Sequence, residues 1–567
     1  MRFNTSITSF HLLLFLFFFF LLLPDTVFAI LDCANNTIPS PTVFGAQILS
    51  ITAYPIDDWQ DIPGNDICYV TISLTHPGAG DLVNNFFALP ISTPWNRVFQ
   101  GIGGGGYAAG TLTAGASQTA IGYSIGATDA GLPTSDPNSS QDASGWALVS
   151  PGNADQVLLL NFARRSVHDL AGLGRALSTS FYGGGNGSSS SSSERGPDRA
   201  YWNGCSTGGR QGLAAAQYYP ADWDGVLADA PAIQWNDFTM AQQWPYTVQN
   251  NEGYVPQPCE LAFVAAQVVE ACDALDGLVD GIVSAPSLCT FTAQGLVGQR
   301  YTCASVNGSS SGMFSQRAAD VVDKILDGPR TPEGEVLWYG LVKGANFSNT
   351  APNIEGNETA QSFTVADSWI RGFIAKDLGF DTANVSYAEF ADIFLQGHLQ
   401  YDSIMGSASP DLAPFKRHGG KIITWQGLAD GTINPQGTMF YYQKILAIDP
   451  SAANFYRQFY SPGVGHCGSG TGVIPTDAIG QLRAWVENGT APDVLHAAST
   501  YPVNAFLDLC PWPSVNRYKG SGDPAEAASW ECASGTGWVE FSGLHPENYS
   551  VVGGPGWYGS SFSAVEI

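Results

Sequence analysis

The five residues Gly204 to Gly208 constrain the fold most, because they fit Gly-x-Ser-x-Gly between an apolar strand at 200–202 and an Ala-rich helix at 211–219. Glycines beside the serine allow the strained turn that raises its hydroxyl above a sheet. Further strand signals at 225–228 and 421–425 alternate with helical segments. This alternation predicts an α/β fold with a mostly parallel sheet. The alternative for the pentapeptide alone is a Gly/Ser turn without chemistry.

The N-terminus has the pattern of a secretory signal peptide, which we assign to residues 1–29. Arg2 precedes an apolar run at 12–23, and residues 27–29 resemble a cleavage site. The run is too short to span a membrane, so we expect no membrane partner. The ten cysteines all follow it, which suits disulfides in an oxidising compartment. Glycosylation acceptors of the form Asn-x-Ser/Thr occur at Asn35, Asn138, Asn186, Asn307, Asn346, Asn357, Asn384, Asn488 and Asn548. We therefore expect a secreted, extracellular glycoprotein carrying N-glycans.

Charge and composition exclude two other classes of protein. The 567 residues carry a formal net charge of −27, with 44% hydrophobic and 12% aromatic residues. So acidic a surface cannot replace the counterions on nucleic acid, which excludes a nucleic-acid partner. The apolar content is high enough for a large core, which excludes disorder for the bulk of the chain.

A serine nucleophile needs a base and a residue that orients the base. Asp430 directly follows the strand signal at 422–428, and His466 lies in a glycine-rich loop after another strand at 455–460. The chain order Ser206, Asp430, His466 is the order found in α/β hydrolases. For either residue taken alone, an ordinary place in a surface loop is the simpler interpretation. Their chain order and their placement after strands together favour a catalytic triad.

Cysteines adjoin two of these three residues. Cys205 precedes the serine and Cys467 follows the histidine. If the two catalytic side chains share a hydrogen bond, their neighbours come within disulfide reach, closing a loop of roughly 260 residues. The alternative is that each cysteine pairs elsewhere.

The segments Trp202–Arg210, Gly427–Asp430 and Gly465–Cys467 resemble the tannase and feruloyl esterase family. The resemblance covers nearly the whole mature chain and implies an α/β-hydrolase fold with a large lid inserted between serine and aspartate. It implies that Ser206 is the nucleophile, His466 the base and Asp430 its orienting acid, with a disulfide joining the neighbours of serine and histidine. The domains expected are a catalytic domain at 30–231 plus 419–567 and a lid domain at 232–418.

The implied function is hydrolysis of phenolic acid esters through an acyl-enzyme. We expect feruloyl (hydroxycinnamoyl) esters of plant cell-wall material, with galloyl esters of tannins as the alternative. Weaker alternatives are a secreted serine carboxypeptidase and a catalytically silent binding glycoprotein. The chemistry needs no organic cofactor. Aromatic residues of the lid could line the pocket, although core packing is the commoner role for each; the candidates are Trp235, Phe238, Trp244 and Tyr246.

The glycine run at 101–106 follows a strand and fits Gly-x-Gly-x-x-Gly. It is a poor dinucleotide fingerprint, because no acidic residue lies about 20 positions on. We interpret it as the loop that supplies one oxyanion amide, from Gly104 or Gly105. The amide of Thr207 at the following helix start supplies the other.

Three carboxylates occur close together between residues 273 and 282, which suits Ca²⁺. From spacing alone, an ordinary acidic turn is slightly preferred. The resemblance implies a structural calcium bound by the side chains of Asp273, Asp276 and Asp280 and the carbonyls of Leu278 and Ile282. Its distance from the triad in sequence indicates a stabilising role.

The remaining cysteines fall into a lid group and two local pairs. The pairing of Cys259, Cys272, Cys289 and Cys303 stays open, because a helix from 259 to 272 would separate its ends by roughly 20 Å. Proximity in the chain predicts the bonds Cys33–Cys68 and Cys510–Cys532.

Overall fold

The computed structural model describes residues 33–35, 38–133, 140–183, 196–305, 308–347, 358–499 and 504–535. The predicted signal peptide lies outside these ranges. So do five of the glycosylation acceptors: Asn138, Asn186, Asn307, Asn357 and Asn548.

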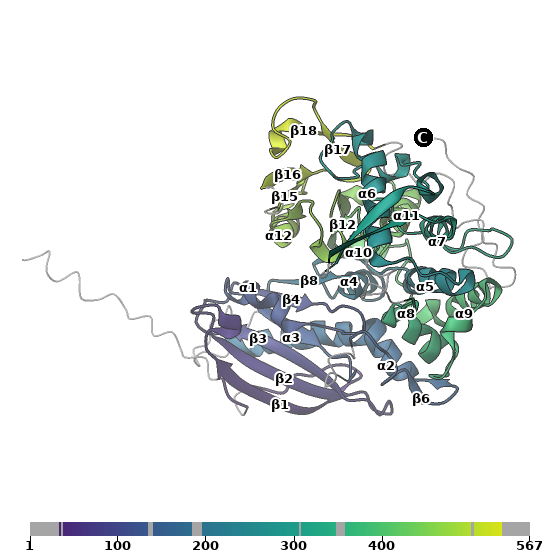
Figure 1. The fold of residues 1–567 in the computed structure, drawn as a ribbon. Helices are drawn as coiled ribbons and strands as arrows, with labels where there is room; N and C mark the ends of the chain where they lie inside the picture. The colour runs from purple at the N-terminus through teal and green to yellow at the C-terminus, as the bar shows by residue number, and fades with distance from the viewer. Residues whose placement is uncertain are drawn as a thin grey trace, which may run out of the picture.

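A twisted mixed sheet forms the centre of the molecule (Figure 1). Within the described residues it has nine strands in the order β1-β2-β3-β5-β4-β8-β9-β12-β13. The pairs from β1 to β5 are antiparallel, and those from β5 to β13 are parallel. Their bounds are β1 Gln47–Ile56, β2 Ile67–Thr75, β3 Val83–Pro90, β4 Val98–Ile102, β5 Ser124–Thr128, β8 Arg199–Cys205, β9 Gly225–Asp229, β12 Lys421–Gly427 and β13 Tyr456–Ser461.

Helices cover both faces of this sheet, which explains its nearly continuous apolar strands. Neighbouring residues of β8 point to opposite faces: Trp202 packs in one core cluster and Tyr201 in the other. The Trp202 face is covered by α3 (Ser166–Gly183), α4 (Thr207–Tyr218) and α11 (Pro435–Ile448). The Tyr201 face is covered by α1 (Ala116–Thr119) and α12 (Ala478–Asn488).

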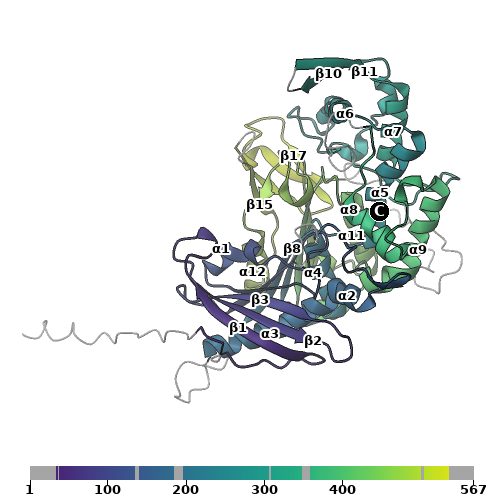
Figure 2. The same cartoon turned by 60° about the horizontal axis from the view of Figure 1, so that its bottom comes forward.

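The chain leaves the sheet after β9 and returns in β12, which pairs directly with β9. Figure 2 shows the intervening helices gathered away from β1–β3. They build their own aromatic-rich core, which also takes in residues such as Tyr107 and Phe162 of the preceding part. The intervening elements are α5 Trp235–Glu252, α6 Pro258–Cys272, β10 Arg300–Ser305, β11 Gly308–Met313, α7 Gln316–Asp327, α8 Thr364–Trp369, α9 Tyr387–Met405 and α10 Ala413–His418. The division into domains at 231 and 418 stays a prediction.

Small sheets complete the described fold: β6 (Leu148–Ser150) with β7 (Asn153–Ala154), β14 (Ile474–Pro475) with β15 (Leu495–Ser499) and β16 (Ala505–Leu509), and β17 (Ser514–Tyr518) with β18 (Trp530–Ser534). Residues 157–160 form a short apolar run, which by its sequence could be a strand or the start of a helix; it is helical, in α2 (Gln156–Leu160). Asp155 caps this helix, because its carboxylate accepts from the amides of Val157 and Leu158. A π-helical turn at Asn161–Arg165 then joins α2 to α3.

Five disulfides bridge the described residues. The structure forms the pairs Cys205–Cys467, Cys33–Cys68 and Cys510–Cys532. In the lid segment, where the sequence leaves the pairing open, the bonds are Cys259–Cys303 and Cys272–Cys289. Cys259 and Cys272 do not bond to each other, because α6 holds them at its opposite ends. None of the helices in the described ranges is both long and apolar enough to cross a bilayer.

Candidate active site

Ser206 lies at the sharp turn between β8 and α4. Its backbone has φ 62° and ψ −121°, a conformation that costs free energy in a residue with a side chain. Its amide donates to the Asp229 carbonyl at 3.0 Å, which holds the turn against β9. The glycines are required by close packing: a Cβ on Gly204 would lie 2.7 Å from the backbone of Gly208. The geometry is that of a nucleophile elbow.

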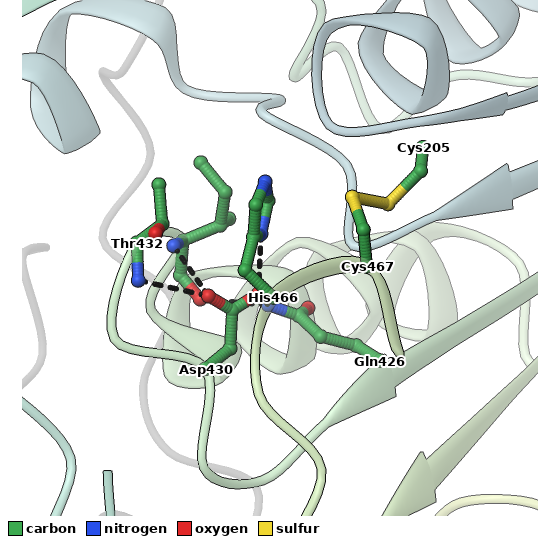
Figure 3. The surroundings of a disulfide bond; sticks show 7 residues. Cys205, Gln426, Asp430, Thr432, His466 and Cys467 are labelled. Atoms are coloured by element: carbon green, nitrogen blue, oxygen red, sulfur yellow. Dashed lines mark hydrogen bonds and ion pairs between the residues drawn. A yellow bond between two sulfur atoms is a disulfide. The ribbon is translucent and has the colours of Figure 1, made fainter. Parts of the chain in front are cut away.

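Asp430 follows β12 and its side chain is fully buried. One carboxylate oxygen accepts the amides of Thr432 and Ile433 at 2.8 and 2.9 Å. The other accepts from Gln426 Nε2 at 3.2 Å and faces His466 (Figure 3). These bonds fix the carboxylate in one orientation.

His466 Nδ1 lies 3.0 Å from Asp430 Oδ2. Because a carboxylate accepts, Nδ1 carries the hydrogen, and Nε2 is left as the basic atom. The histidine side chain is 24% exposed. Burial lowers its pKa, but the charge and hydrogen bond of Asp430 outweigh burial, so the net shift of the His466 pKa is upward from 6.5.

The Cys205–Cys467 disulfide brings the serine and histidine segments together, with Cα atoms 5.9 Å apart (Figure 3). Among the described residues, no hydrogen bond joins the Ser206 hydroxyl to His466. Such contacts are often long in enzymes without substrate and tighten when substrate binds.

The histidine loop, residues 462–470, has two further supports. The Val464 carbonyl accepts from the amide of Ala429, the residue before Asp430, at 2.9 Å. Ile282 covers Gly463, since a Cβ on that glycine would lie 3.1 Å from three carbons of the isoleucine side chain. The acidic segment at 273–282 therefore reaches the histidine loop, although it is distant in sequence.

The glycine run packs against the start of α4. The Gly104 carbonyl accepts from the Gly208 amide at 2.9 Å, and the Gly104 amide faces Gln211 Oε1 at 3.4 Å. In the described part of the chain, the amides of Thr207 and Gly105 have no acceptor. The Thr207 hydroxyl donates to the Gly106 carbonyl at 2.6 Å, so the glycine run meets the residue after the serine, and free amides of the two segments can hold an oxyanion.

The acidic segment has the donor chemistry for calcium but not a closed cage. One buried Asp276 oxygen has no hydrogen-bond partner among the described residues. Burial first, then the charges of Asp276 and Asp273, raise the pKa of Asp280 to about 6, as expected where a cation would relieve repulsion. The Asp273 carboxylate, however, accepts from the amides of Asp280 and Gly281. In the described ranges, no three His, Cys, Asp or Glu side chains gather closely enough to hold a metal ion.

The aromatic residues suggested for the pocket lie in the core. Trp235, Phe238 and Trp244 are buried, and Tyr246 is half-buried. Sequence reasoning missed two supports of the site: Gln426, which donates to Asp430, and the Ile282 side chain, which packs against Gly463. A buried glutamine on a strand carries no local signal. The Asp-Gly-Thr turn that supplies the Thr432 amide could have been recognised.

Comparisons with known proteins agree with this geometry. A family model described as "Tannase and feruloyl esterase" matches residues 68–533. A "Probable feruloyl esterase" of Arthroderma benhamiae is 38% identical over 89% of this chain and 94% of its own length. A "Tannase" of Aspergillus oryzae is 26% identical over 87% of this chain and 90% of its own.

Among solved structures, the "Tannin acyl hydrolase from Aspergillus niger" superimposes with a TM-score of 0.77 at 26% identity, covering 89% of this chain and 96% of that one. Together with the sheet order, this likeness confirms the α/β-hydrolase fold.

Proposed function

Because this chain belongs to the tannase and feruloyl esterase family, we propose that it is a secreted serine esterase acting on phenolic acid esters. It is a carboxylic ester hydrolase by its family and its relatives. The observation that carries the proposed mechanism is the 3.0 Å contact between His466 Nδ1 and the fully buried Asp430. The loop that holds His466 is joined by the Cys205–Cys467 disulfide to the residue before Ser206.

In this proposal Ser206 is the nucleophile. His466 Nε2 takes the hydroxyl proton while Nδ1–H stays bonded to Asp430, and Oγ bonds to the ester carbonyl carbon. As the carbon–oxygen bond to the alcohol breaks, His466 returns the proton to the leaving oxygen. Water, deprotonated by His466, then attacks the acyl carbon; the bond to Ser206 Oγ breaks, His466 returns the proton to Oγ, and the phenolic acid is released.

The negative oxygen formed in each step is stabilised by the amides of Thr207 and Gly105. Both lack an acceptor within the described residues, and Thr207 opens α4, whose N-terminus favours negative charge. Gly104 is the weaker candidate, because its amide already faces Gln211.

The decisive experiment is a rate measurement with Ser206→Ala. With methyl ferulate and methyl gallate as substrates, we expect the rate of ester hydrolysis to fall to the uncatalysed rate measured in buffer without enzyme. Unchanged hydrolysis would show that another group is the nucleophile.

The substrate class we propose is a feruloyl or related hydroxycinnamoyl ester, because the 38% identical relative carries the name of a feruloyl esterase. A galloyl ester is the second candidate, since the tannin acyl hydrolase shares the fold over 89% of this chain. Rates on the methyl esters of ferulic, caffeic, p-coumaric and gallic acids distinguish the two. Hydrolysis of a blocked peptide, with none of these esters cleaved, would instead favour a carboxypeptidase.

We also propose a structural calcium bound by Asp273, Asp276 and Asp280, with the carbonyls of Leu278 and Ile282. The buried, unpartnered oxygen of Asp276 supports it. Binding requires the carboxylates to turn toward a common point. Calorimetric titration of chelator-treated protein with CaCl₂ should show one site, and Asp276→Asn should weaken it. No heat of binding would refute the proposal.

Secretion and N-glycosylation complete the proposal. All four acceptor asparagines within the described ranges are exposed: Asn35, Asn346, Asn384 and Asn488. Five disulfides also suit an oxidising compartment. Expression in a eukaryotic host should yield protein in the medium whose mass falls on treatment with a peptide N-glycosidase.

A further inference from the structure

A buried positive charge lies one helical turn after the proposed nucleophile. Arg210, in the first turns of α4, has none of its surface exposed. Its Nη1 donates to the Ala163 carbonyl at 3.0 Å and its Nη2 to the Phe162 carbonyl at 3.2 Å. Its Nε has no acceptor, and no carboxylate pairs with it, within the described residues. Burying a guanidinium without a counter-charge is unfavourable, so a charged side chain at this position suggests a function that offsets the cost.

The surroundings hold the charge without neutralising it. Both carbonyls belong to the π-helical turn Asn161–Arg165. The rings of Phe162 and Trp235 lie 5.3 and 5.6 Å from the guanidinium carbon, within cation–π range. Burial, and secondly the charge of Arg164, lower the pKa of Arg210 to about 9, so the side chain stays charged at neutral pH.

Arg210 is close to the reacting atoms. Its amide donates to the Ser206 carbonyl at 3.0 Å. Four residues of helix rise by about 6 Å, and side chains tilt toward the helix N-terminus. Trp235 also lies near the elbow, since the amide of Ala232 donates to the same Ser206 carbonyl. We therefore take a separation on the order of 10 Å between the guanidinium and the serine oxygen as the working distance.

The same aromatic residues border the oxyanion loop. Tyr107 directly follows the glycine run, and its ring lies 5.7 Å from Phe162 and 5.6 Å from Trp235. The guanidinium therefore contacts a group of rings that joins the nucleophile helix, the oxyanion loop and the first lid helix, α5.

We propose that Arg210 is a positioning residue for the oxyanion hole, whose uncompensated charge reinforces the N-terminus of α4 and stabilises the tetrahedral intermediate. This rests on the proposed role of Ser206. A unit charge at about 10 Å, in an effective dielectric of about 20, changes the stability of an anion by a factor of roughly 15. The effect acts on the charged intermediate and leaves binding of a neutral ester unchanged.

Phenylboronic acid measures this directly. The Ser206 oxygen bonds to boron, the hydroxyl proton passes to His466, and boron becomes a tetrahedral anion. In Arg210→Met, we expect kcat on methyl ferulate and the affinity for phenylboronic acid each to fall about 15-fold, with KM within twofold of the parent. Arg210→Lys keeps the charge and loses the paired carbonyl contacts, and it should restore most of both.

A lower kcat in Arg210→Met with unchanged boronate affinity would overturn the proposal, because the charge must act on any tetrahedral anion formed at Ser206. Unchanged kcat would overturn it too. If the methionine variant does not fold, the lysine variant decides: boronate affinity within threefold of the parent supports the proposal, and a tenfold loss contradicts it. Ser206→Ala keeps the two questions apart, since hydrolysis surviving in that variant refutes the proposed function whatever Arg210 does.

Discussion

Removing the Cys205–Cys467 disulfide should damage both stability and turnover. The two cysteines are 262 residues apart, and the Cys259–Cys303 bond shortens that loop by 44 residues, to about 218. Loop-closure entropy then gives a stabilisation of about 5 kcal/mol at 25 °C. The same bond joins the residue before the nucleophile to the residue after its base. Its loss therefore also removes one of the attachments that hold the histidine loop.

The matched control is the Cys510–Cys532 bond, which joins β17–β18 to the preceding segment. Its separation of 22 residues gives about 3 kcal/mol by the same relation. We expect Cys205→Ala/Cys467→Ala to lower the free energy of unfolding about 2 kcal/mol more than Cys510→Ala/Cys532→Ala. Only the first double variant should lower kcat, by tenfold or more for a misplaced base.

The assay combines urea unfolding, followed by tryptophan fluorescence, with initial rates on methyl ferulate at a urea concentration where each variant is fully folded. Equal kcat in the two double variants would refute the idea that this disulfide positions the catalytic residues. A larger stability loss in the Cys510/Cys532 variant would refute the loop-entropy reasoning.

Three further predictions follow from the charges. Asp430→Asn should lower kcat by about 10⁴-fold, because the amide favours the wrong histidine tautomer; KM on methyl ferulate should change little. The acid limb of kcat/KM should have its midpoint above 6.5, because His466 must be neutral to act and its pKa is raised; a pH–rate profile with a midpoint below 6 would contradict this. His398 lies between Asp237 and Asp402 at 3.1 and 2.8 Å. Burial lowers its pKa, but the two carboxylates raise it to about 10. The ion pairs therefore stabilise the fold fully below pH 6.5, and this stabilisation is lost as the pH approaches about 10. His398→Gln should accordingly lower the urea midpoint at pH 6, and the difference from the parent should vanish near pH 10.5.

The triad candidates could be identified from sequence because each follows a strand at a turn with its own local signature. Gly204 and Gly208 mark the elbow, and the glycines around His466 mark a loop rather than a helix. Parallel strands bring their carboxyl ends to one edge of a sheet, so three distant segments could be expected to meet there. Chain order then assigns their roles.

The supports of these residues could not be identified in the same way. The π-helical turn at 161–165 keeps nearly the helical spacing of apolar residues, so spacing does not distinguish it from an ordinary helix. The Phe162 and Ala163 carbonyls of this turn accept from the buried Arg210, yet nothing in the local sequence indicates this contact. Gln426 alternates with apolar neighbours on a buried strand, and only the assembled sheet reveals that its amide holds Asp430.

The acidic segment is distant from the triad in sequence but contacts the histidine loop in the folded chain. It lies far along the chain from both Ser206 and His466, which favours a stabilising role over a catalytic one. In the folded chain Ile282 covers Gly463, three residues before the proposed base. Gly463 has φ +70°, a conformation that suits glycine, so the loop cannot easily provide a side chain of its own there. The segment that carries the proposed calcium ligands thus packs one side chain, that of Ile282, against the histidine loop at a position where the loop has none of its own.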